Sequence, residues 1–353
     1  MSTKPASHAR HWLPLTHQPF ASRHAITPQT APMHLVVPFA SAQSEAGQLA
    51  LQSLSLPALE GLLARCAPGT TLGRDAYSAN TPHDQALAHA WGWPGQGAAP
   101  ADDGWADVAL PFAAQAAAAL KLPDAHSAAW GLLSPVHLQA GREQIQLTDP
   151  AGLQLDEAQS RALLAVVAPL FESEGFTLHW ASPLQWLATH ATQFDTLPCA
   201  SLDRVIGRHL DPWLPSQPNA RLLRRLQNEV QMLLYTHPLT EAREAAGLAA
   251  VNSFWLSGCG RLPSIEAATR PTEIHVDERL RAPALAEDWA AWAEAWAALD
   301  AGPITALRGQ PGARLTLCGE RFAQGFEASP QGWWQRVSAN WRKSSAPHWL
   351  LPL

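Results

Sequence analysis

The protein has 353 residues, of which 47% are hydrophobic, and a net charge of −6 at pH 7. Its length suits one large domain or two ordinary ones, and its acidic balance argues against a nucleic-acid-binding protein that depends on a positively charged surface. No uninterrupted apolar run approaches the ~18 residues that cross a bilayer, so we expect no membrane partner.

Composition along the chain predicts the domain organisation. Residues 1–30 show no hydrophobic periodicity and lack the charged-then-apolar order of a secretory signal, so we expect a disordered tail. Residues 31–353 are predicted to form a single α/β domain, with the Gly-, Ala- and Pro-rich segment 95–104 as a candidate internal linker. The four cysteines are far apart and have no CxxC spacing, which is typical of reduced thiols and indicates a cytoplasmic protein.

Strands and helices follow one another through the first part of the chain. We expect strands at 34–40, 136–138, 144–147, 176–180 and from 183 onward, and helices at 49–56, 58–66, 82–91 and 157–174. Asp156 is the predicted N-cap of the last of these helices, where Glu157 and Arg161 form an i, i+4 pair.

A polar segment, SLDRVIGRHLD (201–211), is one candidate site. Arginine binds carboxylate and phosphate groups through a planar fork, so Arg204 and Arg208 are predicted to contact a small anionic molecule. The alternative is that the segment is a solvated polar face.

The stretch 221–260 is the densest in groups that could hold a ligand. Apolar residues at spacings of three and four predict a helix from Arg221 that ends before Pro238, followed by a short helix, a strand at 251–256 and a glycine turn at 257–260. Ligands bind at the carboxyl ends of strands in open α/β sheets. Six residues are therefore predicted to bind the ligand: Asn228, Glu229, His237, Arg243, Asn252 and Ser257. The alternative is that Asn228 and Asn252 satisfy buried backbone groups and that Arg243 lies on the surface.

The last part of the chain predicts strands at 273–276 and 313–319 and helices at 288–299 and 333–341. The tryptophans of helix 288–299 share one stripe, which indicates core packing. His275 with Asp277, and His209 with Asp211, could each be a pair of metal ligands. A two-metal site needs several more convergent ligands, so no metal ligand is assigned.

Several segments resemble a proteobacterial family described as cofactor-independent phosphoglycerate mutase-like, or RpfE-type regulatory protein. They are VHLQAGREQIQLTDP (136–150), SLDRVIGRHLDPWLP (201–215), LQNEVQMLLYTHPLTEAR (226–243), VNSFWLSGCG (251–260), DWAAWAEAWAALDAG (288–302) and LTLCGE (315–320). The resemblance implies distant kinship with alkaline-phosphatase-like metalloenzymes, in which helices flank a mostly parallel sheet and divalent metals are the cofactor. Those enzymes carry an Asp-Gly motif after the first strand, whereas Pro38–Ser41 stands there in this chain.

The sequence leaves three functions open. The first is a mutase-like protein that binds a small phosphorylated or acidic ligand in a regulatory or degenerate-enzyme role. The second is an active metal-dependent phosphomutase or phosphatase with an unusual site. The third is an interaction module that presents some of its sixteen tryptophans to a protein partner. A contiguous exposed tryptophan patch would favour the third function, and scattered burial would disfavour it.

Overall fold

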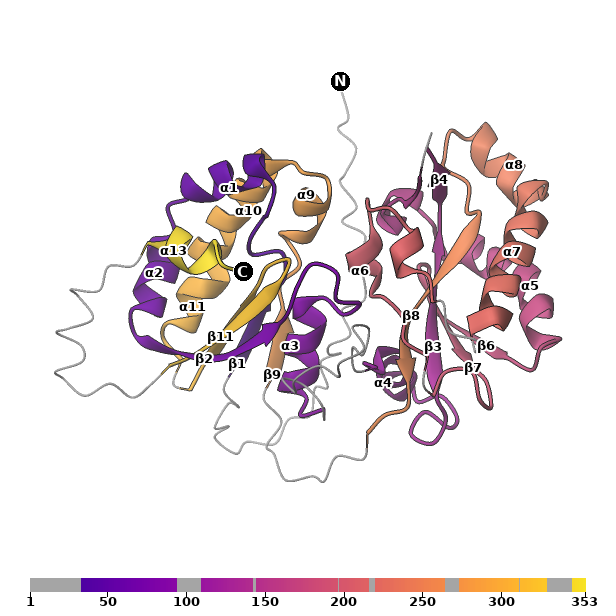
Figure 1. Ribbon diagram of the computed structural model, residues 1–353, viewed down its shortest axis with the longest axis horizontal. Coiled ribbons are helices and arrows are strands. Elements are labelled where there is room, and N and C mark those ends of the chain that lie inside the picture. Colours follow the sequence, from indigo (N-terminus) through magenta and orange to yellow (C-terminus); the bar gives the residue numbers. More distant parts are fainter. Residues whose placement is uncertain are drawn as a thin grey trace, which may run out of the picture.

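The computed structural model describes residues 33–93, 109–141, 144–195, 197–215, 220–263, 273–310, 312–328 and 345–353. Its strands form two separate sheets and one small hairpin (Figure 1). We call the described residues of 33–93 and 273–353 the terminal half, and those of 109–263 the middle half. The predicted tail, the candidate linker and the helix expected at 333–341 lie outside the described residues. The single domain from 31 to 353 stays a prediction.

The sheet of the terminal half has five strands, in the order β2 (Cys66–Gly73), β11 (Phe322–Ala328), β10 (Arg314–Cys318), β1 (Met33–Val37) and β9 (Glu273–Val276). β1 pairs in parallel with β9 and β10, whereas β11 pairs antiparallel with β10 and β2. Leu35, Val36 and Val37 of β1 are all fully buried. This unbroken apolar run is typical of a central strand that is covered on both faces.

Helices cover both faces of that sheet. Leu35 and Val37 pack toward one helix layer, made of α1 (Glu45–Gln52), α2 (Pro57–Leu63), α10 (Trp289–Leu299) and α13 (Ala346–Leu350). Val36 points the other way and packs against α3 (Pro82–Ala90). Two shorter helices, α9 (Arg281–Leu285) and α11 (Thr305–Leu307), flank α10, and a π-helical turn, η4 (Asp300–Ile304), joins α10 to α11.

The middle half is built on an antiparallel sheet with the order β6 (Thr177–Ser182), β7 (Gln185–Thr189), β3 (Trp130–Val136) and β8 (Ser253–Gly260). One face packs against α5 (Glu157–Glu172) and α7 (Arg221–Tyr235), and the other against α4 (Phe112–Ala119). Its remaining elements are the hairpin β4 (Leu138–Ala140) and β5 (Ile145–Leu147), the helices α6 (Leu202–Val205) and α8 (Pro238–Ala245), and the 3-10 turns η1 (Pro150–Leu153) and η2 (Asp211–Trp213).

The α/β class, with helices flanking a sheet, is confirmed. The expectation of one mostly parallel sheet is met only where β9, β1 and β10 lie side by side, and the other described ladders are antiparallel. Short connections explain this difference. Only two residues separate β6 from β7, and so short a link can join only antiparallel strands.

Local predictions are confirmed for most helices and corrected at β8. Asp156 caps α5, and α7 begins at Arg221 as expected. Residues 257–260 do not form a turn after the strand, because β8 continues through them to Gly260. The ladder shifts register between Trp130 and Leu132 of β3, because β8 spans the same interval, Ser257 to Gly260, with one extra residue; Gly258 in this bulge of β8 has a positive φ of 61°. Glycine in a strand commonly marks such a bulge.

Two whole-chain expectations concern apolar surface. Within the described ranges, no helix combines the length and the apolarity needed to span a bilayer. Every tryptophan in those ranges is buried or half-buried, and Trp130, Trp292 and Trp296 are fully buried. The described tryptophans are thus distributed as core residues, which disfavours a tryptophan-rich docking patch on this part of the chain.

Candidate functional site

A cavity of about 160 Å³ lies between the two halves. The terminal half lines it with residues that include Pro38, Asn80, His83, Asp84, Leu87, Trp91, Val276, Glu278 and Arg281. The middle half contributes, among others, Phe112, Leu132, Ser134, Gln185, Leu197, Cys199, Asp203, Ser257 and Cys259. Apolar side chains form most of the wall.

The parallel strands bring one side of this cavity together. Pro38 follows the end of β1, and Val276 ends β9, so both lie at the carboxyl edge of the same sheet. The backbone remains paired one residue beyond the strand, because the Asp277 amide donates to the Val36 carbonyl at 3.0 Å. Carboxyl edges of parallel strands are the usual position of ligand sites in α/β proteins.

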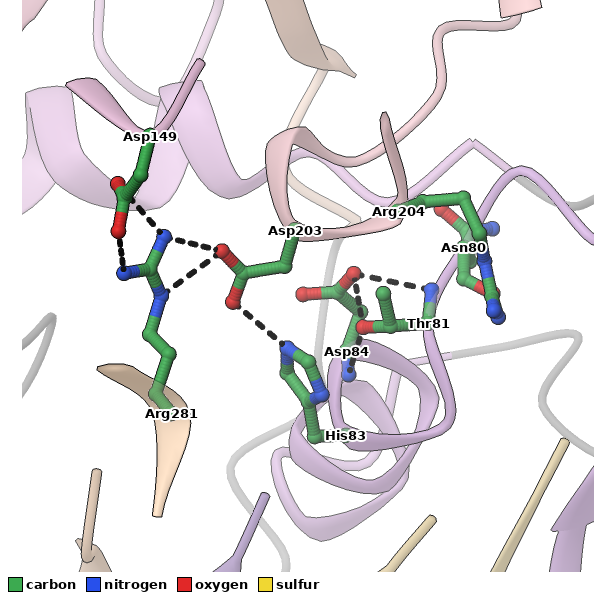
Figure 2. A network of polar contacts seen from close by, with 8 residues as sticks. All are labelled: Asn80, Thr81, His83, Asp84, Asp149, Asp203, Arg204 and Arg281. Carbon is green, nitrogen blue, oxygen red and sulfur yellow. Dashed lines mark hydrogen bonds and ion pairs between the residues drawn. The ribbon is translucent and has the colours of Figure 1, made fainter. Parts of the chain in front are cut away.

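Four charged residues form a network beside the cavity, and it connects the two halves (Figure 2). The Arg281 guanidinium donates to the Asp203 carboxylate at 2.6 and 2.9 Å and to the Asp149 carboxylate at 3.1 and 3.5 Å. His83 Nε2 lies 3.3 Å from the second oxygen of Asp203. The side chain of Arg281 is only 7% exposed, so the network is largely removed from solvent.

The position of His83 is determined by the start of α3. Thr81 is the N-cap, and its hydroxyl accepts from the Asp84 amide while the Asp84 carboxylate accepts from the Thr81 amide. This reciprocal capping box fixes the first helical turn. His83 stands in that turn and therefore points at Asp203 from a rigid element, as Figure 2 shows.

The network sets the charge of its members. Burial alone would raise the pKa of Asp203, but the charges and hydrogen bonds of Arg281 and His83 hold it well below its usual range. Burial alone would lower the pKa of His83, yet the hydrogen bond to Asp203 and the charges of Asp84 and Asp203 outweigh it and raise that pKa. Asp203 is therefore ionised at neutral pH, and His83 holds its proton more tightly than a free imidazole does.

Glu278 adds a third carboxyl group to the lining, beside Asp84 and Asp203. Glu278 is exposed to solvent on part of its surface. The surrounding protein and the charge on Asp203 raise its pKa. Three carboxyl groups thus face two basic groups, His83 and Arg281, and Arg281 is already paired with two carboxylates.

The structure does not bring the eight sequence-predicted site residues together. Ser257 alone of them lines the cavity. Arg204 is buried and donates to the backbone oxygens of Asn80 and Glu320. Arg208 pairs with the Glu320 carboxylate at 3.1 Å. These two arginines tie segment 201–208 to the terminal half, next to the cavity but outside its lining.

The other five also lie outside the lining of the cavity. The side-chain amide of Asn252 accepts a hydrogen bond from the Leu138 N–H and donates one to the Leu138 C=O, as the backbone of a neighbouring strand would. Arg243 is buried and donates to the carbonyls of Leu153 and Ala249 and to the Gln159 side chain. The remaining three are the exposed Asn228, Glu229, which pairs with Arg225, and His237, which caps α8. The backbone-satisfying alternative therefore describes Asn252, whereas Arg243 is not a surface residue. Ligand-binding roles for these residues stay predictions.

The candidate metal pairs do not converge. His275 is exposed, whereas Asp277 is buried and bonds Arg279 at 2.7 Å. His209 lies 3.5 Å from Asp211 on a partly exposed surface. In the described ranges no group of three or more His, Cys, Asp or Glu side chains is arranged to hold a metal ion.

Two cysteines, which spacing alone did not connect, meet in the cavity wall. The Sγ atoms of Cys199 and Cys259 are 3.3 Å apart, although 60 residues separate them in the chain. Both are free thiols. Cys199 is half-buried and Cys259 is buried in β8.

Comparison with known proteins adds little to this description. No protein-family model and no curated protein matches the sequence. A cofactor-independent phosphoglycerate mutase from Thermoplasma acidophilum is similar at a TM-score of 0.34 and 12% identity, over 85% of this chain and 90% of that one. The PH0037 protein from Pyrococcus horikoshii gives a TM-score of 0.42 and 12% identity, over 85% and 88%. Both TM-scores are below 0.5, so neither similarity supports an argument about function.

Proposed function

We propose that this protein binds a small organic molecule in the cavity between its two halves. The observation that carries this proposal is the combination of a mostly apolar wall with a few convergent charged groups, His83, Asp203 and Arg281. This combination is usual for small-molecule sites. An apolar cavity of ~150 Å³ in another protein admits one benzene molecule, so the enclosed part of the ligand has about the size of one ring.

The charges of the lining favour a ligand that donates hydrogen bonds, such as a hydroxyl compound or an amine. The lining includes the carboxyl groups of Asp84, Asp203 and Glu278, which accept hydrogen bonds, and the aromatic side chains of Trp91 and Phe112, a residue type that attracts positive groups. A phosphorylated or acidic ligand, the class predicted from the sequence, has to compete with the carboxylates already bound to Arg281 and His83. We propose a binding role, regulatory or that of a degenerate enzyme, as the sequence resemblance implies.

A thermal-shift screen tests this proposal. Small amines, polyols, carboxylic acids and phosphate monoesters are each added to the wild type, to Ala79→Phe, which fills the cavity, and to Ala76→Phe, a nearby half-exposed control outside the lining. We expect an amine or a polyol to raise the Tm of the wild type and of the control but not that of Ala79→Phe. Stabilisation that survives in Ala79→Phe would place the binding elsewhere. Stabilisation by acids and phosphates alone would replace the proposed ligand class with the acidic one.

The second candidate, an active metal-dependent phosphomutase or phosphatase, has its support in the sequence resemblance. Its direct test is the isomerisation of 3-phosphoglycerate by purified protein with Mn²⁺ and with a chelator. Turnover that requires the metal and is lost in the chelator would favour this candidate over a binding protein. If the isomerisation rate equals the background rate both with Mn²⁺ and with the chelator, the binding role is favoured.

A further inference from the structure

We propose that Cys199 and Cys259 form a reversible disulfide, which makes the cavity wall a site of oxidative modification. The geometry supports this pairing first. The sulfurs are already 3.3 Å apart, and a disulfide needs about 2.0 Å, so about 1.3 Å of approach is sufficient. This inference does not depend on which ligand the cavity holds.

The surroundings of the two thiols differ in a way that suits stepwise oxidation. Cys199 is half-buried, so an oxidant in solution reaches it more readily than a fully buried thiol. Cys259 is buried in β8, and burial and its contact with Cys199 raise its pKa well above the usual value. Cys199 is therefore the thiol that reacts first, and Cys259 is the one that resolves the intermediate.

The backbone around Cys199 allows its sulfur atom to approach that of Cys259. Cys199 belongs to a segment, 197–200, without helix or strand, just ahead of α6. Cys259 is held in β8 by pairing with β3. Both thiols make weak sulfur hydrogen bonds to nearby backbone, with Cys199 Sγ 3.6 Å from the Leu197 carbonyl oxygen and Cys259 Sγ 3.9 Å from the Ser257 carbonyl oxygen. Closure of the bond thus requires a shift of the irregular segment and not of the sheet.

The reaction is an exchange with a low-molecular-weight disulfide, R–S–S–R. Cys199 loses its proton to solvent, its thiolate attacks one sulfur of the oxidant, and the oxidant's S–S bond breaks with release of one RS⁻. Cys259 then loses its proton to solvent and attacks the Cys199 sulfur, which releases the second RS⁻. Each RS⁻ can take up a proton. The protein has lost two hydrogens, and the oxidant has been reduced to two thiols.

The disulfide would couple the redox state to the cavity. Segment 197–203 carries both Cys199 and Asp203, and Asp203 holds the charged network through Arg281 and His83. A covalent link from this segment to β8 would therefore fix the segment against the sheet of the middle half. We expect the oxidised protein to unfold at a higher temperature, because the link restricts the unfolded chain.

The test is equilibration of the full chain with mixtures of oxidised and reduced glutathione, followed by alkylation and peptide mapping. We expect two of the four thiols to become unreactive, a peptide linked through Cys199 and Cys259, and full reversal by dithiothreitol. Cys66 and Cys318 are internal controls, and both should still be alkylated after denaturation. Burial raises the pKa of Cys66 to about 11 and that of Cys318 still further.

Two variants identify the order of events. Cys259→Ser should accumulate a stable glutathione adduct at Cys199, whereas Cys199→Ser should accumulate none at Cys259. The peptide map of the wild type remains decisive if either variant fails to fold. A wild type that stays folded and keeps four alkylatable thiols in the most oxidising mixture would overturn the proposal. So would a linkage that forms only in denaturant.

Discussion

Replacement of Arg281 by methionine should destabilise the protein strongly. The side chain of Arg281 is 7% exposed, and its guanidinium donates to the carboxylates of Asp203 and Asp149. Removal of one member of a buried ion pair leaves uncompensated charge and costs about 3–5 kcal/mol. Because the partner carboxylates are 17% and 26% exposed, water can reach them in part, and we expect the lower end, about 3 kcal/mol. With about 2.1 cal/mol/K of unfolding entropy per residue, this lowers the Tm by about 4 °C for 353 residues.

The assay is chemical and thermal unfolding at pH 7, with Arg314→Met as the matched control. Arg314 pairs with Glu327, but both side chains are about half exposed or more, so its loss should cost at most about 1 kcal/mol. The double variant Arg281→Met/Asp203→Asn should recover part of the loss, because the uncompensated carboxylate is then neutral. Equal stability of Arg281→Met and Arg314→Met would refute the claim that the network stabilises the contact between the halves.

The pH dependence of the unfolding free energy is a second test of the Arg281→Met variant. The folded pKa of Asp203 lies below its unfolded value, so its contribution is present above about pH 4 and is lost as the pH falls through the folded pKa. The Arg281→Met variant has less of this contribution to lose. The difference in unfolding free energy between the wild type and the variant should therefore narrow on acidification. A constant difference from pH 7 to pH 3 would contradict this explanation.

Three further predictions follow from single contacts. The folded pKa of His83 is raised, so its stabilisation is complete below about pH 6.5 and declines as the pH rises through the folded pKa; this pH slope between 6 and 9 should be absent in His83→Gln. Asp300→Ala should cost about 1–3 kcal/mol in urea unfolding, because the carboxylate accepts two amide hydrogen bonds at the start of α2, a helix with no side-chain cap of its own. Asn252→Ala should cost about 1–2 kcal/mol by the same measurement and leave every ligand-induced Tm shift unchanged, since its amide bonds the backbone of Leu138 away from the cavity.

Elements with local signals could be predicted from the sequence. Asp156 and Pro82 mark the starts of α5 and α3, and the apolar spacing after Arg221 predicts α7. α4 has no such signal, because FAAQAAAA is almost uniformly apolar and shows no polar face, although alanine favours helix. Strand direction could not be predicted in this way. It depends on which strands pair across the chain, and periodicity contains no information about that.

The site was predicted only in part for the same reason. The polar segment 201–211 contains Asp203, which does face the cavity, but its partner Arg281 is 78 residues away in the chain. Asp149, the second carboxylate on Arg281, is 132 residues from that arginine. Helical spacing reports neighbours three or four positions apart. The Cys199–Cys259 contact across 60 residues is equally invisible to a search for CxxC. The stretch 221–260 is dense in polar groups, yet only Ser257 of its six predicted residues lines the cavity, and His237, Arg243 and Asn252 bond backbone groups instead.

The pairing of β1 has a consequence for biosynthesis. His34 on this strand bonds Thr316 on β10, 282 residues later in the chain. A growing polypeptide therefore exposes the apolar β1 until β9 and β10 have left the ribosome. The antiparallel sheet of the middle half, which lies between β1 and β9 in the chain, can form before then. Such late, distant contacts make folding slow and favour association with other unfinished chains. We expect the nascent chain to depend on chaperones for its first strand more than for the segment inserted between the two ends of that sheet.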